Sequence, residues 1–364
     1  MISANKYGKK EIPRLLLRGL DSLYVGFYLE LPESLSISEL VIEKEKIRER
    51  RDEFTEIALG SETFALMPYG KHPYQIVLVN KFAEIRLGPR IAPNCYVQFF
   101  SESLWQLGLD ETISRFTLWL NSIGARKLRP ESISRADWSF DFDLLIVDFD
   151  PDSFVTRATK DSAWREHRQL QTIQLGTGDC VVRLYDKIAE IEQQSAKAFF
   201  FDLWGQSKNV WRVEFQVRRP RLKKAGINNF QDLKDFQVDL LRELSGDHTR
   251  LCIPAGDSNR ARWPLHPLWQ SLTKAISSLP QTGLVADIEA AKGLKLRMFQ
   301  QSRSLHGSLK GLATLLMAIE RRPEPPSLQH VIQKLPHLLK EHHQSWDWDD
   351  DVKKRRQMLE LGKW

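Results

Sequence analysis

Three segments of the chain alternate between polar and apolar residues, and this alternation constrains the fold more than any other feature of the sequence. The segments are 134–144 (SRADWSFDFDL), 179–187 (DCVVRLYDK) and 210–218 (VWRVEFQVR). Successive side chains on a β-strand point to opposite faces, so this spacing predicts three strands, each with an apolar and a polar face. We expect a sheet that buries the apolar row of each segment.

The first segment carries an unusual number of carboxylates on its polar face. Its apolar row consists of Trp138, Phe140, Phe142 and Leu144, and its polar row consists of Arg135, Asp137, Ser139, Asp141 and Asp143. Like charges two residues apart on one face repel each other, and a cation or metal ion usually offsets this cost. The periodicity alone equally allows a solvated strand face on which Arg135 supplies the counter-charge.

The other two segments place basic residues and a tyrosine on their polar faces. Arg183, Tyr185 and Lys187 share one face of the second segment, and Arg212, Glu214, Gln216 and Arg218 share one face of the third. If the three strands are neighbours, their polar faces form one chemically exposed site. Such a site suits phosphoryl transfer, because carboxylates bind a metal ion, arginines neutralise phosphate charge and a tyrosine can attack phosphorus.

The rest of the chain predicts an α+β fold with an antiparallel-sheet core and flanking helices, followed by a helical C-terminal appendage. Further strands are expected at 20–31, 74–79, 83–87 and 95–100, and helices at 36–54 and 110–123. The pattern becomes helical from about 228, and the prolines of RRPEPPS must end a helix in the tail. The predicted domains are 1–275 and the helical region 283–364.

The composition says more about the cellular compartment of the protein than about its activity. The 364 residues carry a formal net charge of +6, which favours polyanionic partners only weakly. Cys95, Cys180 and Cys252 lie far apart, so neither a disulfide framework nor a zinc ribbon is indicated. The sequence has no stretch that predicts an export signal or a membrane span, and we expect a cytoplasmic protein without a membrane partner.

Several ordered motifs resemble the replication initiation factor family, which contains rolling-circle initiators of certain plasmids and related relaxases of integrative and conjugative elements. The motifs are YVQFFSESLW, RADWSFDFD, TIQLGTGDCVVRLYDKIAEIE, WRVEFQVRR and RWPLHPLW. The resemblance extends from about residue 20 to about residue 270 and leaves out the helical tail. It implies a mobile-element protein that nicks one DNA strand, joins the 5′ phosphate through a tyrosine and leaves a free 3′ hydroxyl.

The resemblance also implies roles for individual residues. Tyr185 would be the nucleophile, and the residues that hold the scissile phosphate would be Arg183, Lys187 and Arg212. The ligands of a divalent metal ion, Mg²⁺ or Mn²⁺, would be Asp137, Asp141 and Glu214. Many rolling-circle enzymes bind metal through two histidines in an H-x-H motif, which this chain lacks. His167 is the one histidine near the motif strands, although an exposed histidine in a loop or helix is the more common explanation.

DNA is the expected partner, as origin duplex and as single strand. The candidate DNA-binding residues are Arg135, Arg218, Arg260, Arg262 and Trp263, because arginines beside aromatic rings suit phosphate contact and base stacking. Relatives also imply recruitment of a host helicase and polymerase. The sequence leaves open whether the protein acts as a homodimer and which origin it recognises.

Two alternatives compete with the nickase interpretation. One is a tyrosine recombinase, but such enzymes carry the tyrosine late in the chain on a helix, whereas Tyr185 lies mid-chain on a predicted strand and no tyrosine follows it. A non-catalytic protein that binds single-stranded or origin DNA could use the same basic and aromatic surface, with Tyr185 stacking on a base. Such a protein would gain nothing from carboxylates that face its ligand. The glycines of LGTGD could approach a phosphate closely, but a hairpin turn before 179–187 is the more common explanation.

Overall fold

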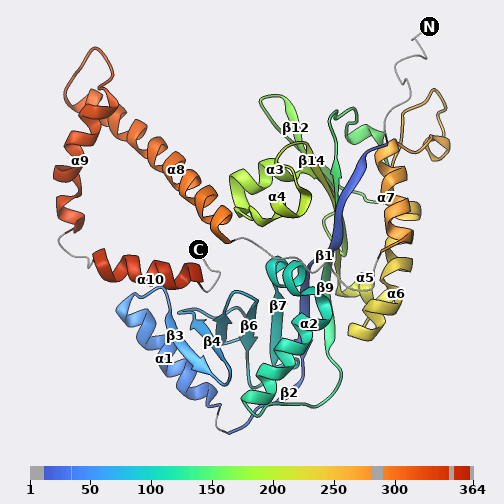
Figure 1. The fold of residues 1–364 in the computed structure, drawn as a ribbon, viewed down its shortest axis with the longest axis horizontal. Coiled ribbons are helices and arrows are strands. Elements are labelled where there is room, and N and C mark those ends of the chain that lie inside the picture. The colour runs from blue at the N-terminus through green and yellow to red at the C-terminus, as the bar shows by residue number, and fades with distance from the viewer. Residues whose placement is uncertain (1–11, 34, 280–289, 344–347, 361–364) are drawn as a thin grey trace. The chain divides into compact units, whose positions relative to one another are not determined.

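The computed structural model describes residues 12–33, 35–279, 290–343 and 348–360 (Figure 1). The chain divides into two compact units. The first comprises residues 1–189 and 203–287, and the second comprises 190–202 and 288–364. The predicted helical region therefore belongs to the second unit together with an internal segment that the sequence did not assign to it. Its predicted start at 283 lies outside the described residues.

The first unit is built on one sheet of eleven strands in the order β11-β12-β13-β14-β9-β1-β7-β6-β5-β4-β3. The strands are β1 (Arg14–Phe27), β3 (Thr55–Leu59), β4 (Glu62–Leu66), β5 (Ile76–Val79), β6 (Ala83–Leu87), β7 (Cys95–Phe99), β9 (Ser132–Asp143), β11 (Asp161–Glu166), β12 (Gln169–Leu175), β13 (Cys180–Asp186) and β14 (Val210–Arg218). Neighbouring strands pair antiparallel. The predicted antiparallel sheet is confirmed.

Two short sheets accompany the large one. The first pairs β2 (Leu29–Glu30) with β8 (Arg126–Lys127), and the second pairs β10 (Phe154–Thr156) with β15 (Thr249–Leu251).

The three alternating segments form neighbouring strands, as predicted. β14 lies between β13 and β9 and pairs with both. β13 ends at Asp186, and Lys187 begins the short helix α3 (Lys187–Glu190). The prediction that Lys187 continues the strand was therefore wrong by one residue, because the Asp186 carboxylate accepts hydrogen bonds from the backbone N–H groups of Ile188 and Ala189 and starts a helical turn.

Helices of the first unit follow or flank the strands. They are α1 (Ile37–Arg50), α2 (Ser101–Ser122), α5 (Arg219–Lys224), α6 (Phe230–Glu243) and α7 (Pro267–Ser277). Ser36 caps α1, because its hydroxyl accepts a hydrogen bond from the backbone of Glu39 at 3.2 Å. α2 is longer than predicted and changes direction at Gly108, where φ is 76°.

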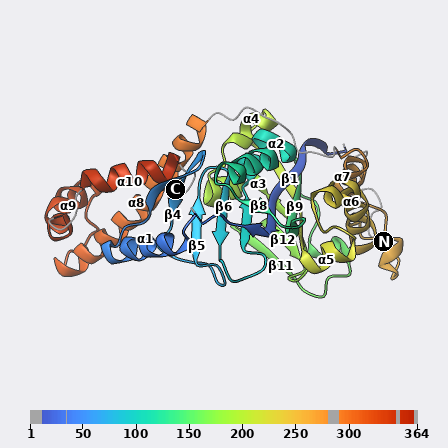
Figure 2. The ribbon, with the colours of Figure 1, turned by 90° about the horizontal axis from the view of Figure 1, so that it is seen from below.

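The apolar rows of the three strands pack under α6 and α7, which run along the same side of the sheet (Figures 1 and 2). Phe215 contacts the ring of Trp269 in α7 with centroids 6.4 Å apart, and Phe140 contacts Phe215 at 6.2 Å. Trp138 Nε1 donates a hydrogen bond to Gln237 in α6 at 3.0 Å. Trp269 is thus a packing residue of the core.

The second unit contains three long helices, α8 (Ala290–Ile319), α9 (Leu328–His343) and α10 (Trp348–Glu360). The prolines of RRPEPPS separate α8 from α9, as predicted. α4 (Phe199–Trp204) begins in the second unit and ends in the first. Among the described residues, no helix has the length and apolar character needed to cross a membrane.

Candidate functional site

The register of the sheet brings five of the predicted site residues into two adjacent rows on one face, which we call the polar face, and Asp137 lies on the same face opposite Gln216. One row runs from Gln174 through Arg183, Glu214 and Ser139 to Gly19, and the next runs from Thr172 through Tyr185 and Arg212 to Asp141. Directly paired residues of an antiparallel sheet point to the same side and have closely spaced Cβ atoms. The predicted convergence of the three polar rows is confirmed.

Tyr185 lies at the centre of these rows. Its hydroxyl donates a hydrogen bond to Glu214 Oε2 at 3.0 Å. The other oxygen of that carboxylate accepts from Arg183 Nη1 at 2.7 Å. Lys187 Nζ lies 5.8 Å from the centroid of the Tyr185 ring, although Lys187 starts a helix. The phenol is therefore surrounded by a hydrogen-bonded carboxylate and two cations.

Arg183 is the member of this group with substantial access to solvent. Its side chain is 28% exposed, whereas Tyr185 is 8% exposed and Lys187 only 2%. Arg183 Nε also donates to Gln174 Oε1 at 2.9 Å, and its Nη1 donates to Gln216 Oε1 at 3.1 Å. Three neighbouring strands thus hold the guanidinium in one orientation while part of it remains accessible.

A buried ion pair lies beside Tyr185. Arg212 donates from Nε to Asp141 Oδ1 at 2.6 Å and from Nη2 to Asp141 Oδ2 at 2.9 Å, and both side chains are inaccessible to solvent. Arg212 Nη1 also contacts Asp21 Oδ1 at 3.1 Å. Burial lowers the pKa of Arg212, but Asp141 and Asp21 outweigh it and hold this pKa well above its ordinary value. The guanidinium therefore stays charged.

Sequence reasoning missed Asp21, which joins the polar face from β1. The pairing of β1 with β9 shifts register between Leu20 and Ser22, so Asp21 lies in an irregularity of the strand. Its carboxylate accepts hydrogen bonds from Ser101 at 2.9 Å and from Trp105 Nε1 at 2.8 Å. A single acidic residue within a largely apolar strand was the available signal, but Asp21 lies outside the three alternating segments.

Asp137 and Arg135 form a second pair on the polar face. Arg135 Nε donates to Asp137 Oδ1 at 2.9 Å, and the guanidinium lies 4.8 Å from the centroid of the Tyr24 ring. Burial raises the pKa of Asp137 to about 7, with further contributions from the nearby charges of Glu214 and Asp21 and opposition from Arg135. Arg135 thus supplies the counter-charge that the simplest interpretation of this strand required.

The polar face is buried, which corrects the expectation of a chemically exposed surface. Asp137, Ser139, Asp141, Arg212 and Gln216 are all buried. Trp204, the last residue of α4, donates from Nε1 to Asp141 Oδ2 at 2.8 Å and so lies against the polar face. The ring of Trp105 lies over Gly19, where a Cβ atom would come within 2.9 Å of it. Two tryptophans from distant helices thus cover part of a row that alternation alone left open.

The predicted metal ligands do not fit a shared metal site in this conformation. Both oxygens of Asp141 accept hydrogen bonds, and Arg135 and Arg183 engage Asp137 and Glu214. Within the described part of the chain, no three His, Cys, Asp or Glu side chains are arranged to hold a metal ion. One observation favours a bound ligand or water: among the described residues, the buried Ser139 Oγ and Gln216 Nε2 have no hydrogen-bond partner.

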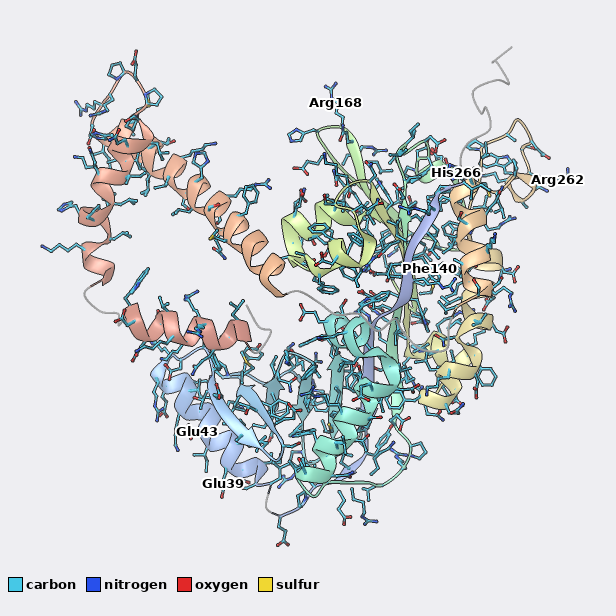
Figure 3. The ribbon with its side chains drawn as sticks, viewed as in Figure 1. Glu39, Glu43, Phe140, Arg168, Arg262 and His266 are labelled. Atoms are coloured by element: carbon cyan, nitrogen blue, oxygen red, sulfur yellow. The ribbon has the colours of Figure 1, made fainter. Side chains whose placement is uncertain are left out.

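The predicted DNA-binding residues fall into two places. Arg218 is exposed and pairs in register with Arg135, so these two arginines lie at one end of the polar face. Arg260 and Arg262 lie in the loop before α7, which packs on the opposite face of the sheet (Figure 3). Arg260 stacks on Trp263 at 4.8 Å from the ring centroid, and Trp263 Nε1 donates to the backbone oxygen of Asp257 at 2.9 Å. The structure does not bring this loop to the polar face.

The local backbone explains two smaller features of the sequence, the LGTGD segment and His167. LGTGD forms the turn between β12 and β13, and Gly176 has a φ of 86°, which favours glycine. His167 lies at the exposed tip of the hairpin between β11 and β12, beside Arg168 (Figure 3). Its position agrees with the explanation of an exposed loop histidine.

Comparison with known proteins finds similarity to solved structures. The chain is similar to the rolling circle replication initiator protein from Geobacillus stearothermophilus, with 16% sequence identity and a TM-score of 0.45. The match covers 75% of this chain and 99% of that chain. No protein-family model and no curated protein sequence matches the chain.

Proposed function

We propose that this protein is a DNA nickase that starts rolling-circle replication or conjugative transfer through attack of Tyr185 on a scissile phosphate. The observation that carries the proposal is the hydrogen bond from the Tyr185 hydroxyl to the Glu214 carboxylate. The other oxygen of the same carboxylate accepts a hydrogen bond from Arg183. A nucleophile, a proton acceptor within 3.0 Å and a guanidinium suited to phosphate are the groups that this reaction needs.

The reaction is a single displacement at phosphorus. Attack forms a bond between Tyr185 Oη and phosphorus and breaks the bond from phosphorus to the 3′ oxygen. The phenol proton passes to Glu214, and the departing 3′ oxygen takes a proton from solvent to become a hydroxyl. The product is a 5′-phosphotyrosyl protein and a free 3′ end, which a polymerase extends or which attacks the intermediate to close the strand.

The cations have different roles in this mechanism. Arg183, the more exposed of them, contacts the phosphate and stabilises the charge that develops on it. Lys187 adds positive charge beside the Tyr185 ring. Arg212 is inaccessible and bound to Asp141, so we assign it a positioning role, in which the buried pair fixes the strand that carries Glu214.

A requirement for Mg²⁺ or Mn²⁺ is a separate part of the proposal. A divalent ion would polarise a phosphate oxygen when bound. Asp137, Asp141 and Glu214 would hold it only if their present contacts open, because hydrogen bonds engage both oxygens of each carboxylate. We also propose that the protein recruits a host helicase and a polymerase and that it acts as a homodimer.

The test uses labelled single-stranded DNA from the element that encodes the protein, with and without Mg²⁺ or Mn²⁺. Wild type should give a DNA-linked protein band on a denaturing gel, and Tyr185→Phe should bind the same DNA but give no such band. Tyr96→Phe is the matched control, because Tyr96 also lies in the sheet and makes a hydroxyl hydrogen bond, to Ser134 at 2.6 Å. Absence of the band with wild type and metal would favour the non-catalytic DNA-binding protein, and a band with Tyr185→Phe would assign the nucleophile elsewhere.

A further inference from the structure

Trp164 lies in the same row of the sheet as Tyr185. It pairs directly with Thr172 on β12, and Thr172 pairs directly with Tyr185 on β13. Side chains in one such row point to the same side of the sheet, so the indole projects from the polar face. Neighbouring strands are about 4.8 Å apart, which places the backbone of Trp164 about 10 Å from that of Tyr185.

Trp164 is exposed, whereas the residues at the other end of its row are buried. The side chain is 50% exposed, whereas Tyr185, Arg212 and Asp141 are buried. β11 is the first strand in the sheet order and forms one edge of the sheet. The row thus changes along its length from a buried ion pair, through the proposed nucleophile, to an accessible indole at the edge.

The hairpin that carries Trp164 also presents two arginines. Arg165 and Arg168 are exposed, and Figure 3 shows Arg168 projecting from the hairpin tip. His167 and Arg168 both have left-handed backbone angles, with φ of 49° and 69°, which makes the turn tight. Glu166 and Asp161 are the acidic side chains of the same strand. An exposed aromatic ring beside arginines is the arrangement by which proteins bind single strands, through base stacking and phosphate contact.

We propose that Trp164 is a stacking platform for a base of single-stranded DNA close to the phosphate that Tyr185 attacks, with Arg165 and Arg168 contacting the neighbouring phosphates. The proposal rests on the proposed function for the position of that phosphate. This placement of Trp164 gives DNA a route to the buried polar face. The single strand of DNA enters over the sheet edge at β11 rather than through the side covered by Trp204 and Trp105. Trp164 is then a positioning residue that sets which nucleotide lies beside Tyr185.

The experiment measures binding of a fluorescein-labelled oligo(dT) strand in the Tyr185→Phe background, in which cleavage does not interfere. Loss of one stacked base weakens binding by about 5- to 150-fold, so Trp164→Ala should raise Kd by that factor and Trp164→Phe should recover most of the affinity. Trp348→Ala is the control, because Trp348 is another exposed tryptophan, in α10 of the second unit. Kd values for Trp164→Ala equal to those of its background, or an equal loss with Trp348→Ala, would overturn the platform.

A parallel assay of covalent adduct with Tyr185 present separates this inference from the proposed function. If wild type forms no adduct but Trp164→Ala still weakens binding, the result supports base stacking on Trp164 and contradicts the proposed nickase activity. If wild type forms the adduct and Trp164→Ala changes neither binding nor cleavage, the result supports the proposed nickase activity and contradicts base stacking on Trp164. Where both hold, Trp164→Ala should also raise KM for the single strand more than it lowers kcat.

Discussion

The Tyr185 hydroxyl and the Glu214 carboxylate are joined by a hydrogen bond of 3.0 Å across the β13 and β14 strands. Because Arg183 occupies the other oxygen of the carboxylate at 2.7 Å, Glu214 cannot turn away without breaking an ion pair. The sequence suggested Glu214 as a metal ligand, whereas its position suits a general base. The two roles make different predictions.

Glu214→Gln should slow formation of the covalent adduct by about 10²- to 10⁴-fold, the usual contribution of a general base. Binding of the single strand should be equal or tighter, since the substitution removes a negative charge near the phosphate. Adduct formation in single-turnover reactions, together with Kd from anisotropy, checks both expectations.

The control for that variant is Glu62→Gln, because Glu62 also lies in the sheet and pairs with an arginine, Arg115, at 2.9 Å. It should match wild type in adduct formation. If a large excess of Mn²⁺ restores cleavage by Glu214→Gln, Glu214 is a metal ligand rather than the base.

The sequence predicted the centre of the sheet better than its edge. β14 and β6 were predicted at their observed bounds, because full alternation or a short apolar run between turn residues is a strong local signal. β11 and β12 were not predicted, since a half-exposed edge hairpin such as DSAWREHRQLQ needs little apolar patterning. Trp164 was missed for this reason.

The residues of the candidate site could be predicted from the sequence, but their burial and their hydrogen-bond partners could not. Alternation correctly placed Asp137, Asp141, Glu214 and Tyr185 on one face. The burial of that face depends on Trp105 and Trp204, which come from helices whose packing no local pattern specifies. Partners that lie far apart in the chain, and the bulge that adds Asp21, arise only from the tertiary fold.

Asp141→Asn should destabilise the protein rather than only abolish catalysis. The change leaves the buried Arg212 without its main counter-charge, and breaking such a pair costs about 3 to 5 kcal/mol. The free energy of unfolding from urea titration measures this cost. Asp143→Asn is the matched control two residues along β9, since Asp143 makes only a partly exposed contact of 3.5 Å with Arg14, for which about 0 to 1 kcal/mol is expected. Equal stabilities of Asp141→Asn and wild type would leave Asp141 available as a metal ligand.

His248 should make the protein less stable in mild acid. Burial lowers its pKa, as does the charge of Arg221 and Arg157, while Glu243 opposes them. The unfolded chain therefore binds a proton more readily than the folded chain, so stability is present above the unfolded pKa of about 6.5 and is lost as the pH falls below it. The free energy of unfolding of wild type should fall more between about pH 8 and about pH 5.5 than that of His248→Asn. The exposed His167→Asn variant should follow wild type, and parallel pH profiles for wild type and His248→Asn would contradict the assignment.

Gly19 should be intolerant of even a methyl group, because it makes room for Trp105 at the edge of the polar face. A Cβ atom at Gly19 would lie 2.9 Å from Trp105 Cη2 and 3.1 Å from Cζ3, and the ring is fully buried. Trp105 also donates to Asp21 at 2.8 Å, and Asp21 in turn accepts from Arg212. Displacement of the ring therefore disturbs the charge network beside Tyr185.

Gly19→Ala should accordingly lower the free energy of unfolding by about 1 to 3 kcal/mol, as overpacking does in well-packed cores, and should also slow adduct formation. Urea titration and single-turnover assays measure the two effects. Gly178→Ala is the control, since a Cβ atom there meets nothing within 4 Å, and restricting the unfolded chain makes such a change neutral or mildly stabilising. If Gly19→Ala equals wild type in stability but still slows the reaction, Trp105 shifts without strain, and its hydrogen bond to Asp21 is what the chemistry depends on.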